Sequence, residues 1–290
     1  MEPHVAVLVL DTPMEGVTET FGDFGDNAIA LMKESSIQFI KYQIAFDLSA
    51  TKDDERNLKT CEEVLSVLTA GIRDKVIKGA IFTGSRSDAF LEEHPWITQL
   101  DKFIQTTIFN TPNFPVVGLC FGHQLLAKNL GCKVSRNSAE NGWEAGTTTI
   151  SLNKSILDIS SSPFRSALVT ADGKFMEHIN LVEFHRDIVY GMPPTSTHSL
   201  LSSTSFQNLG NTAKCSIQGL ITESGPIKIL TFQGHPEFTT AESLKMLELM
   251  AQENKLDKAV FERLAYNTKN LENQGYIIGG VIRNFIESHI

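Results

Sequence analysis

The chain has 290 residues, of which 41% are hydrophobic and 20% are charged, a composition that can build a large globular core. Its formal net charge of −9 argues against nucleic acid or an anionic membrane as a partner, because both ligands require a basic surface. The early apolar run VAVLVL (5–10) is too short to span a membrane and follows Glu2 rather than a basic cluster. It therefore favours a first strand over a signal peptide.

The first half of the chain alternates between apolar, strand-like runs and amphipathic, helix-like stretches. Strands are expected over residues 4–11, 37–46, 78–85 and 115–120, and helices within 18–36, 58–73, 95–110 and 122–131. Such alternation predicts an α/β fold with an open, mostly parallel sheet and helices on both faces. Ligands of such sheets bind beyond the carboxyl ends of the strands.

From about residue 143 the segments become shorter and more β-like, at 147–153, 174–184, 198–204, 215–221 and 226–233. Residues 195–214 are rich in Ser, Thr and Asn and predict turns and loops. The last fifty residues, from Thr240, have the apolar spacing of helices. We therefore expect one domain over 1–240 and a helical extension over 241–290 that packs on the core, or on a partner protomer.

The four cysteines are Cys61, Cys120, Cys132 and Cys215, and no two of them form a C-x-x-C pair. A zinc site is therefore not expected, and a chain of this size does not need disulfides for stability. Reduced thiols predict a cytoplasmic protein.

Cys120 stands where an apolar run meets a helix-like pattern, between Gly118 and Gly122. This spacing fits the G-x-[Ser/Cys]-x-G nucleophile elbow, in which small neighbours permit a sharp strand-to-helix turn. The helix start favours the thiolate and makes the N–H of Phe121 a candidate oxyanion donor. The alternative is an ordinary buried cysteine at the end of a core strand.

A cysteine nucleophile needs a base, and His235 follows another apolar strand in LTFQGHPEF (230–238). Glu237 lies two residues further on, and residues two apart in an extended segment point to the same side. Its carboxylate can therefore hold one ring nitrogen of His235. Gly84, in a turn after a third strand, is a candidate for the second oxyanion donor, although a tight turn alone would also explain it.

Together these residues resemble the class I glutamine amidotransferase-like superfamily. The resemblance rests on GLCFGHQ (118–124), GHPE (234–237), the turn FTGSRSD (82–88) and HRDIV (185–189), all in the family's order. It covers about residues 4–240. The turn, GWEAG (142–146) and FQGHPEF (232–238) are most similar to the stand-alone branch, which includes fungal glutamine amidotransferase-like proteins and plant γ-glutamyl peptidases.

The resemblance implies a flavodoxin-like fold and a cysteine triad that cleaves a γ-glutamyl amide without a metal or a cofactor. Cys120 would form a glutamyl thioester, His235 would act as acid and base, and Glu237 would orient His235. The backbone N–H groups of Gly84 and Phe121 would form the oxyanion hole. The substrate would be bound by Gln124, Ser85, His185, Arg186 and Trp143. Arg186 departs from the Gly of many relatives, and His185 could equally make a structural hydrogen bond.

The sequence does not determine the leaving group, the role of the C-terminal helices or the oligomeric state. A free γ-glutamyl hydrolase acting on glutamine, glutathione or a γ-glutamyl conjugate is favoured. The main alternative is a subunit that donates ammonia to a synthase. That synthase would be a separate protein, because this sequence shows neither a synthase-sized extension nor a G-x-x-x-x-G-K-[ST] motif for ATP. A non-catalytic scaffold, a redox sensor at Cys120 and an α/β-hydrolase are rivals that account for fewer of these residues.

Overall fold

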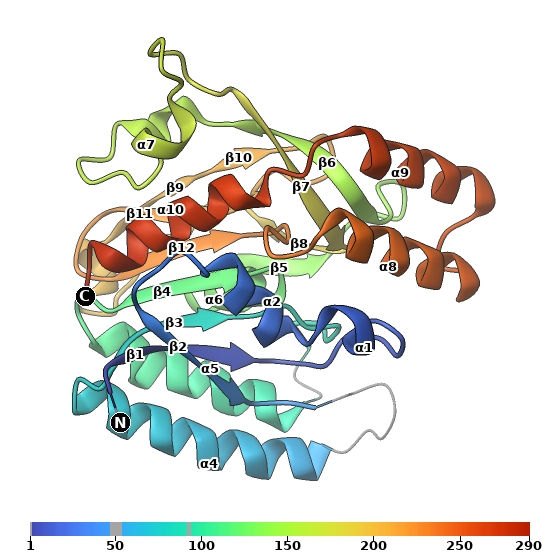
Figure 1. Cartoon of the computed structure of the whole chain (residues 1–290). Helices are drawn as coiled ribbons and strands as arrows, with labels where there is room; N and C mark the ends of the chain where they lie inside the picture. Colours follow the sequence, from blue (N-terminus) through green and yellow to red (C-terminus); the bar gives the residue numbers. More distant parts are fainter. Residues whose placement is uncertain (1, 47–53, 92–93) are drawn as a thin grey trace.

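The computed structural model describes residues 2–46, 54–91 and 94–290 (Figure 1). Within them, a seven-stranded sheet has the order β2-β1-β3-β4-β12-β11-β9. Its parallel part consists of β2 (Gln38–Gln43), β1 (His4–Val9), β3 (Ile77–Phe82), β4 (Pro115–Leu119) and β12 (Lys228–Phe232). The strands β11 (Leu220–Ser224) and β9 (Ser205–Asn208) extend it in antiparallel pairing. The predicted mostly parallel α/β sheet is confirmed.

Helices cover both faces of this sheet. On one face, α4 (Asp54–Arg73), α5 (Pro95–Thr106) and α6 (Phe121–Asn129) pack on side chains such as Ala6 and Leu8. On the other face, α2 (Phe24–Leu31) and α10 (Gly275–Glu287) pack on Val5 and Val7. Because successive residues of a strand point to opposite faces, an apolar run such as VAVLVL is what a strand buried on both sides requires.

Two smaller antiparallel sheets lie beside the large one. The first has the order β10-β6-β7, from β10 (Gly210–Asn211), β6 (Glu144–Leu152) and β7 (His178–His185). The second pairs β5 (Lys133–Arg136) with β8 (Asp187–Tyr190). An isolated bridge between Val182 of β7 and His235 joins the first small sheet to the chain just after β12.

The C-terminal segment is helical, as the apolar spacing predicts, and it forms three helices. The helix α8 (Thr240–Gln252) begins with a capping box between Thr239 and Glu242, and Asp257 caps α9 (Lys258–Asn270). In Figure 1, α8 and α9 lie at the end of the molecule to which the arrows of β1 and β3 point. They pack on β6, with Leu247 and Met250 buried against Val182 and Phe184 of β7. Part of this segment therefore stands beyond the carboxyl ends of the parallel strands.

Some short elements differ from the expectations. Residues 198–204, expected to be β-like, form a turn and a 3-10 helix (Leu201–Ser203), and residues 195–214, expected to be loop, contain β9 and β10. The strand β9 is half-buried at the sheet edge, where its pairing with β11 outweighs its polar composition. The helices α1 (Thr18–Phe21) and α7 (Arg165–Leu168) are single turns.

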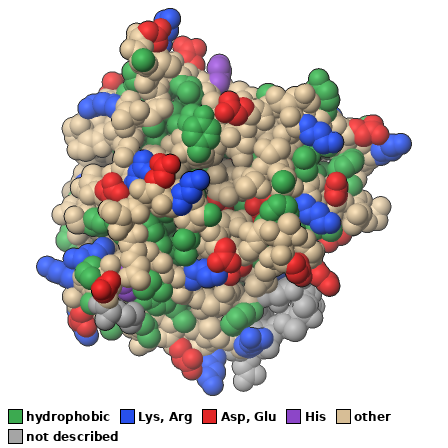
Figure 2. Space-filling view, viewed as in Figure 1, with side chains coloured by type: hydrophobic (Ala, Val, Ile, Leu, Met, Phe, Trp, Pro, Cys, Tyr) green, Lys and Arg blue, Asp and Glu red, His purple; other side chains and the backbone are tan. Residues whose placement is uncertain are grey.

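Charged side chains of both signs lie interspersed over the face drawn in Figure 2. Within the part of the chain that the structure describes, no helix is long and apolar enough to cross a membrane.

Candidate active site

Cys120 lies between β4 and α6 with a backbone that a non-glycine residue rarely adopts, φ 48° and ψ −101°. The two flanking glycines make this turn possible. A Cβ on Gly118 would stand 2.7 Å from the backbone carbon of Gly122, and a Cβ on Gly122 would collide with the carbonyl oxygen of Phe82 on β3. Only glycine allows the helix to start so close to the sheet. The turn has the geometry of a nucleophile elbow.

The Cys120 side chain is 5% exposed and has several polar neighbours. Its Sγ lies 3.9 Å from the carbonyl oxygen of Phe184, and Nε2 of Gln233 donates to it at 3.7 Å. The ring of His235 is within hydrogen-bonding reach of the thiol. The sulfur is therefore at the end of a helix, beside a base and beneath β7.

His235 is held on three sides. Its Nδ1 lies 2.8 Å from Oε1 of Glu237 and donates to that carboxylate, which leaves Nε2 as the atom available to Cys120. Its ring stacks on the ring of Phe238, with 4.2 Å between centroids and 4° between planes. Its backbone N–H donates to the carbonyl oxygen of Val182 at 2.7 Å. Burial lowers the pKa of His235, but the Cys120 thiolate and the Glu237 carboxylate outweigh it and raise that pKa well above 6.5.

Gly84 follows β3 and lies against both reacting side chains. A Cβ at this position would be 3.0 Å from Cε1 of His235 and 3.9 Å from Cβ of Cys120. The backbone of Gly84 therefore borders the same space as the N–H of Phe121, which is among the first N–H groups of α6 and lacks an intrahelical acceptor. These are the two groups expected to form an oxyanion hole.

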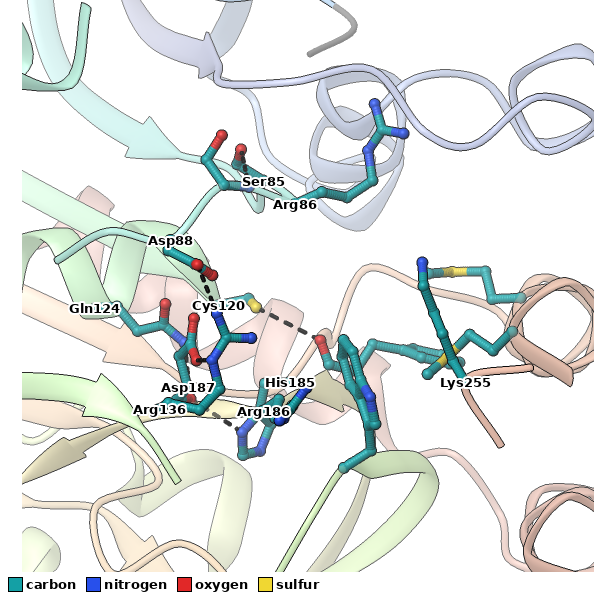
Figure 3. A pocket seen from close by; sticks show the side chains of 15 residues that line it. Ser85, Arg86, Asp88, Cys120, Gln124, Arg136, His185, Arg186, Asp187 and Lys255 are labelled. Atoms are coloured by element: carbon teal, nitrogen blue, oxygen red, sulfur yellow. Dashed lines mark hydrogen bonds and ion pairs between the residues drawn. The ribbon is translucent and has the colours of Figure 1, made fainter. Parts of the chain in front are cut away.

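A pocket of about 350 Å³ opens in front of Cys120 (Figure 3). The labelled polar residues Asp88, Gln124, Arg136 and Asp187 lie on one side of Cys120, and Lys255 lies on the other. Trp143, Phe184, Met246 and Met250 add apolar surface to its lining. Ser85, His185 and Arg186 also line the pocket, so each substrate-binding residue expected from the sequence borders this one space.

Comparison with known proteins identifies the family of this chain. The glutamine amidotransferase class-I family model matches residues 97–251, more than half of the chain. The chain belongs to the class-I glutamine amidotransferase family. The match includes both Cys120 and the His235–Glu237 pair.

Three relatives illustrate what this chain is similar to. A glutamine amidotransferase-like protein of Schizosaccharomyces pombe is 25% identical over 288 residues, which cover 99% of this chain and 100% of the relative. Gamma-glutamyl peptidase 2 of Arabidopsis thaliana is 24% identical over 213 residues, or 72% of this chain and 73% of the peptidase. The crystal structure of a glutamine amidotransferase from Methylobacillus flagellatus has a TM-score of 0.61 and 16% identity, and the match covers 100% of this chain and 96% of that one. This last likeness shows the fold.

Beneath the pocket, Glu144, Glu183 and His185 form a buried ionic cluster. Nε2 of His185 lies 2.9 Å from Oε2 of Glu144 and 3.2 Å from Oε2 of Glu183, and Nδ1 lies 3.2 Å from the carbonyl oxygen of Asp187. Burial lowers the pKa of His185, but the two carboxylates raise it to about 10. Both ring nitrogens are thus engaged inside the protein, although the residue borders the pocket.

The same three residues are also candidate metal ligands. Among the described residues, they are the group of His, Cys, Asp or Glu side chains whose ligand atoms lie close enough for one ion, within 4.8 Å of one another. A protonated His185 already balances one of the two carboxylates. Burial raises the pKa of Glu183 to about 7, against the opposing effect of His185, so protonation of this carboxyl can remove the remaining charge. His185 and Glu144 then form an ion pair and Glu183 is neutral, so the three side chains balance their charges among themselves.

Several residues that line the pocket or contact the thiol have no role in the sequence-based prediction. Asp88 and Asp187 lie inside the motifs TGSRSD and HRD, so their motif positions were a usable indication. Gln233, which contacts the thiol, lies directly before the GHPE motif. Met246, Met250 and Lys255 belong to the C-terminal segment, and only the packing of α8 on β7 brings them to the pocket.

Proposed function

We propose that this protein hydrolyses a γ-glutamyl amide with Cys120 as nucleophile, His235 as general acid and base, and Glu237 as the group that orients His235. The observation that supports this best is the 2.8 Å contact between Nδ1 of His235 and Glu237, on a ring that reaches a cysteine in a nucleophile elbow. A buried structural cysteine would need none of these contacts.

In the first half-reaction, the Sγ thiolate of Cys120 attacks the γ-carbonyl carbon. The carbonyl oxygen becomes an oxyanion that the N–H groups of Gly84 and Phe121 would stabilise. The imidazolium of His235 then gives its proton to the amide nitrogen, the C–N bond breaks, and an amine leaves. The glutamyl group remains bound to Cys120 as a thioester.

In the second half-reaction, neutral His235 takes a proton from water, and the resulting hydroxide attacks the thioester carbon. The C–S bond breaks, Cys120 leaves as a thiolate beside the imidazolium, and glutamate is released. Glu237 accepts the Nδ1–H bond in both steps, so the ring keeps its tautomer and its orientation.

The apolar part of the pocket favours a leaving group larger than ammonia. Pockets of roughly 300–1,000 Å³ accommodate drug-sized ligands, and a space of about 350 Å³ exceeds the needs of glutamine alone. Its lining includes Trp143, Met246 and Met250 together with the ammonium group of Lys255. We therefore favour a γ-glutamyl peptide or conjugate, whose leaving amine bears an apolar side chain or a carboxylate.

The test is to incubate the purified protein with glutamine, glutathione and γ-glutamyl dipeptides, and to measure free glutamate and ammonia. Cys120→Ala is the control and should be inactive. Turnover of glutathione or dipeptides above glutamine is the expected result. Turnover of glutamine alone would instead indicate an ammonia-donating subunit for a separate synthase. Release of glutamate from none of the substrates by the intact protein would refute the proposal.

A further inference from the structure

A buried carboxylate ties the turn after β3 to the end of β1. Asp11 lies two residues beyond β1, and its side chain is fully buried. Its Oδ2 accepts hydrogen bonds from the backbone N–H of Arg86 at 2.9 Å and from Nε of Arg86 at 3.0 Å. Its Oδ1 accepts from Nη2 of Arg86 at 3.0 Å and from the N–H of Thr12 at 2.7 Å. One carboxylate therefore holds both the backbone and the side chain of Arg86.

Thr83 ties the other side of the same turn to β1. Its Oγ1 accepts a hydrogen bond from the N–H of Leu10 at 3.0 Å, and its own N–H donates to the carbonyl oxygen of Leu8 at 3.2 Å. The bonds of Thr83 precede Gly84 in the chain, and those of Arg86 follow it. Gly84 therefore lies between two points that are anchored to the same strand end.

Gly84 is the residue of this turn that most needs such restraint. A Cβ at this position would crowd Cε1 of His235 at 3.0 Å, so glycine keeps the base in place. Glycine has more backbone freedom than any other residue, so its N–H has no preferred direction of its own. An oxyanion donor must be aimed before the charge develops on the substrate oxygen. Anchors on the neighbouring residues can supply the rigidity that Gly84 itself lacks.

The direction of the Arg86 side chain argues against a role in substrate binding. Arg86 borders the pocket, but Figure 3 shows its side chain extending away from Cys120. Its guanidinium is engaged by Asp11, which has no exposed surface from which to contact a ligand. Position 11 also continues the apolar run 5–10, where a hydrophobic side chain would pack without burying a charge. The carboxylate therefore serves the turn rather than the packing of the strand.

We propose that Asp11 and Arg86 are positioning residues that aim the N–H of Gly84 at the reacting carbonyl oxygen. The pair acts through the backbone of the turn, without contacting the reacting atoms. This inference rests on the proposed chemistry of Cys120 and adds the device that keeps one half of the oxyanion hole in place. Loss of the pair should slow each reaction of Cys120 that passes through an oxyanion, and should spare its other reactions.

The test compares two reactions of the same thiolate. With p-nitrophenyl acetate, the sulfur of Cys120 bonds to the acetyl carbon, the carbonyl oxygen becomes an oxyanion, and p-nitrophenolate leaves. With iodoacetamide, the sulfur bonds to a saturated carbon, iodide leaves, and no oxyanion forms. The burst of p-nitrophenolate measures acylation, and a peptide map measures alkylation. The ratio of the two rates therefore reports on the oxyanion hole alone, with Cys120→Ala giving the background.

Asp11→Asn keeps the shape of the side chain but replaces one acceptor oxygen by an NH2 donor. Whichever way the amide turns, it loses either the bonds from the N–H and Nε of Arg86 or those from Nη2 of Arg86 and the N–H of Thr12. Removal of one oxyanion donor slows catalysis by about 100- to 1,000-fold, and a misdirected donor should give part of this loss. We therefore expect acylation to slow about 10-fold or more, and alkylation to change less than about 3-fold.

Arg86→Ala tests the other partner and permits a chemical rescue. It keeps the backbone N–H bond to Asp11 but loses the side-chain bonds, so acylation should slow about 5-fold or more. The side chain is 29% exposed, so millimolar guanidinium ion can reach the vacated site and should restore acylation, whereas methylammonium should not. Thr222→Val is the matched control. It removes buried hydrogen bonds to Ile227 and Ile229 near the start of β12, remote from the pocket, and should change neither rate.

Equal slowing of acylation and alkylation in folded Asp11→Asn would assign the pair a purely structural role and overturn the inference. Unchanged acylation in both variants, or no acylation of Cys120 in the wild type, would overturn it as well. If Asp11→Asn does not fold, Arg86→Ala and its rescue decide. Neither probe contains a γ-glutamyl group, so a failure of γ-glutamyl hydrolysis is distinguishable from a failure of this inference. With a γ-glutamyl substrate, Asp11→Asn should lower kcat about 10-fold or more and change KM less than about 3-fold.

Discussion

Replacement of His185 by Leu should greatly destabilise the fold. The imidazolium of His185 is buried between Glu144 and Glu183, at 2.9 Å and 3.2 Å, and both carboxyl groups are themselves buried. Leu fills a similar space but offers no proton to either carboxylate. The change would leave two acidic groups buried with one cation fewer.

The expected loss of unfolding free energy at pH 7 is about 3–5 kcal/mol, the usual cost of removing one partner of a buried ion pair. The raised pKa of His185 leads to a similar loss of unfolding free energy. A rise in the pKa of His185 from 6.5 to about 10 corresponds to roughly 4 kcal/mol at pH 7. This stabilisation is complete below pH 6.5 and is lost as the pH rises through 10, so most of it is present at pH 7.

Urea unfolding at pH 7, followed by fluorescence or circular dichroism, measures the change. His178→Leu is the matched control, because His178 lies on the same strand with its side chain exposed, and it should change stability by less than about 0.5 kcal/mol. The double variant Glu183→Leu, His185→Leu should recover part of the loss. A loss below about 1 kcal/mol for His185→Leu, or no recovery in the double variant, would refute this account of the cluster.

Three further outcomes are expected. In the native protein at pH 6.5, iodoacetamide should alkylate Cys120, because this cysteine lines the pocket beside an imidazolium. It should spare the other three cysteines, because burial raises the pKa of their thiols. Comparable labelling of all four cysteines in a peptide map would contradict this expectation. The protonated form of Glu183 stabilises the fold below pH 4.5, and this contribution is lost as the pH rises through 7. Between pH 5 and pH 8, the unfolding free energy measured with urea should therefore fall by about 2–3 kcal/mol more in the wild type than in Glu183→Gln. An equal fall in both proteins would exclude this titration. Gly122→Ala should cost about 1–3 kcal/mol and lower activity, because its Cβ meets the carbonyl of Phe82; an unchanged melting temperature would count against that clash.

The sequence predicts the central strands of the large sheet well because these strands are buried on both faces. VAVLVL and PVVGL are continuous apolar runs, and the intervening helices have regular apolar spacing. The edge strand β9 (SFQN) and the two-residue β10 could not be recognised in the same way. Their pairing with β11 and β6 depends on contacts between distant segments, which local composition does not encode.

The candidate site was predictable to a similar degree. The residues around Cys120 and His235 lie in short motifs whose spacing has a local physical reason, namely an elbow and an extended His-Pro-Glu segment. The groups that shape the rest of the pocket depend on tertiary structure. Arg136 sits on a four-residue strand, and Met250 reaches the pocket only because α8 folds back over β7.

The hydrogen bond between the N–H of His235 and the carbonyl of Val182 has a mechanical consequence. The thiol is fixed to the large sheet through β4, whereas the base is attached both to β12 and to the small sheet. A sliding motion of one sheet over the other would therefore change the separation of sulfur and imidazole directly. In the proposed mechanism, proton transfer between Cys120 and His235 would therefore depend on how rigidly the two sheets are connected, and slow deuterium exchange at the His235 amide would be a direct measure of that rigidity.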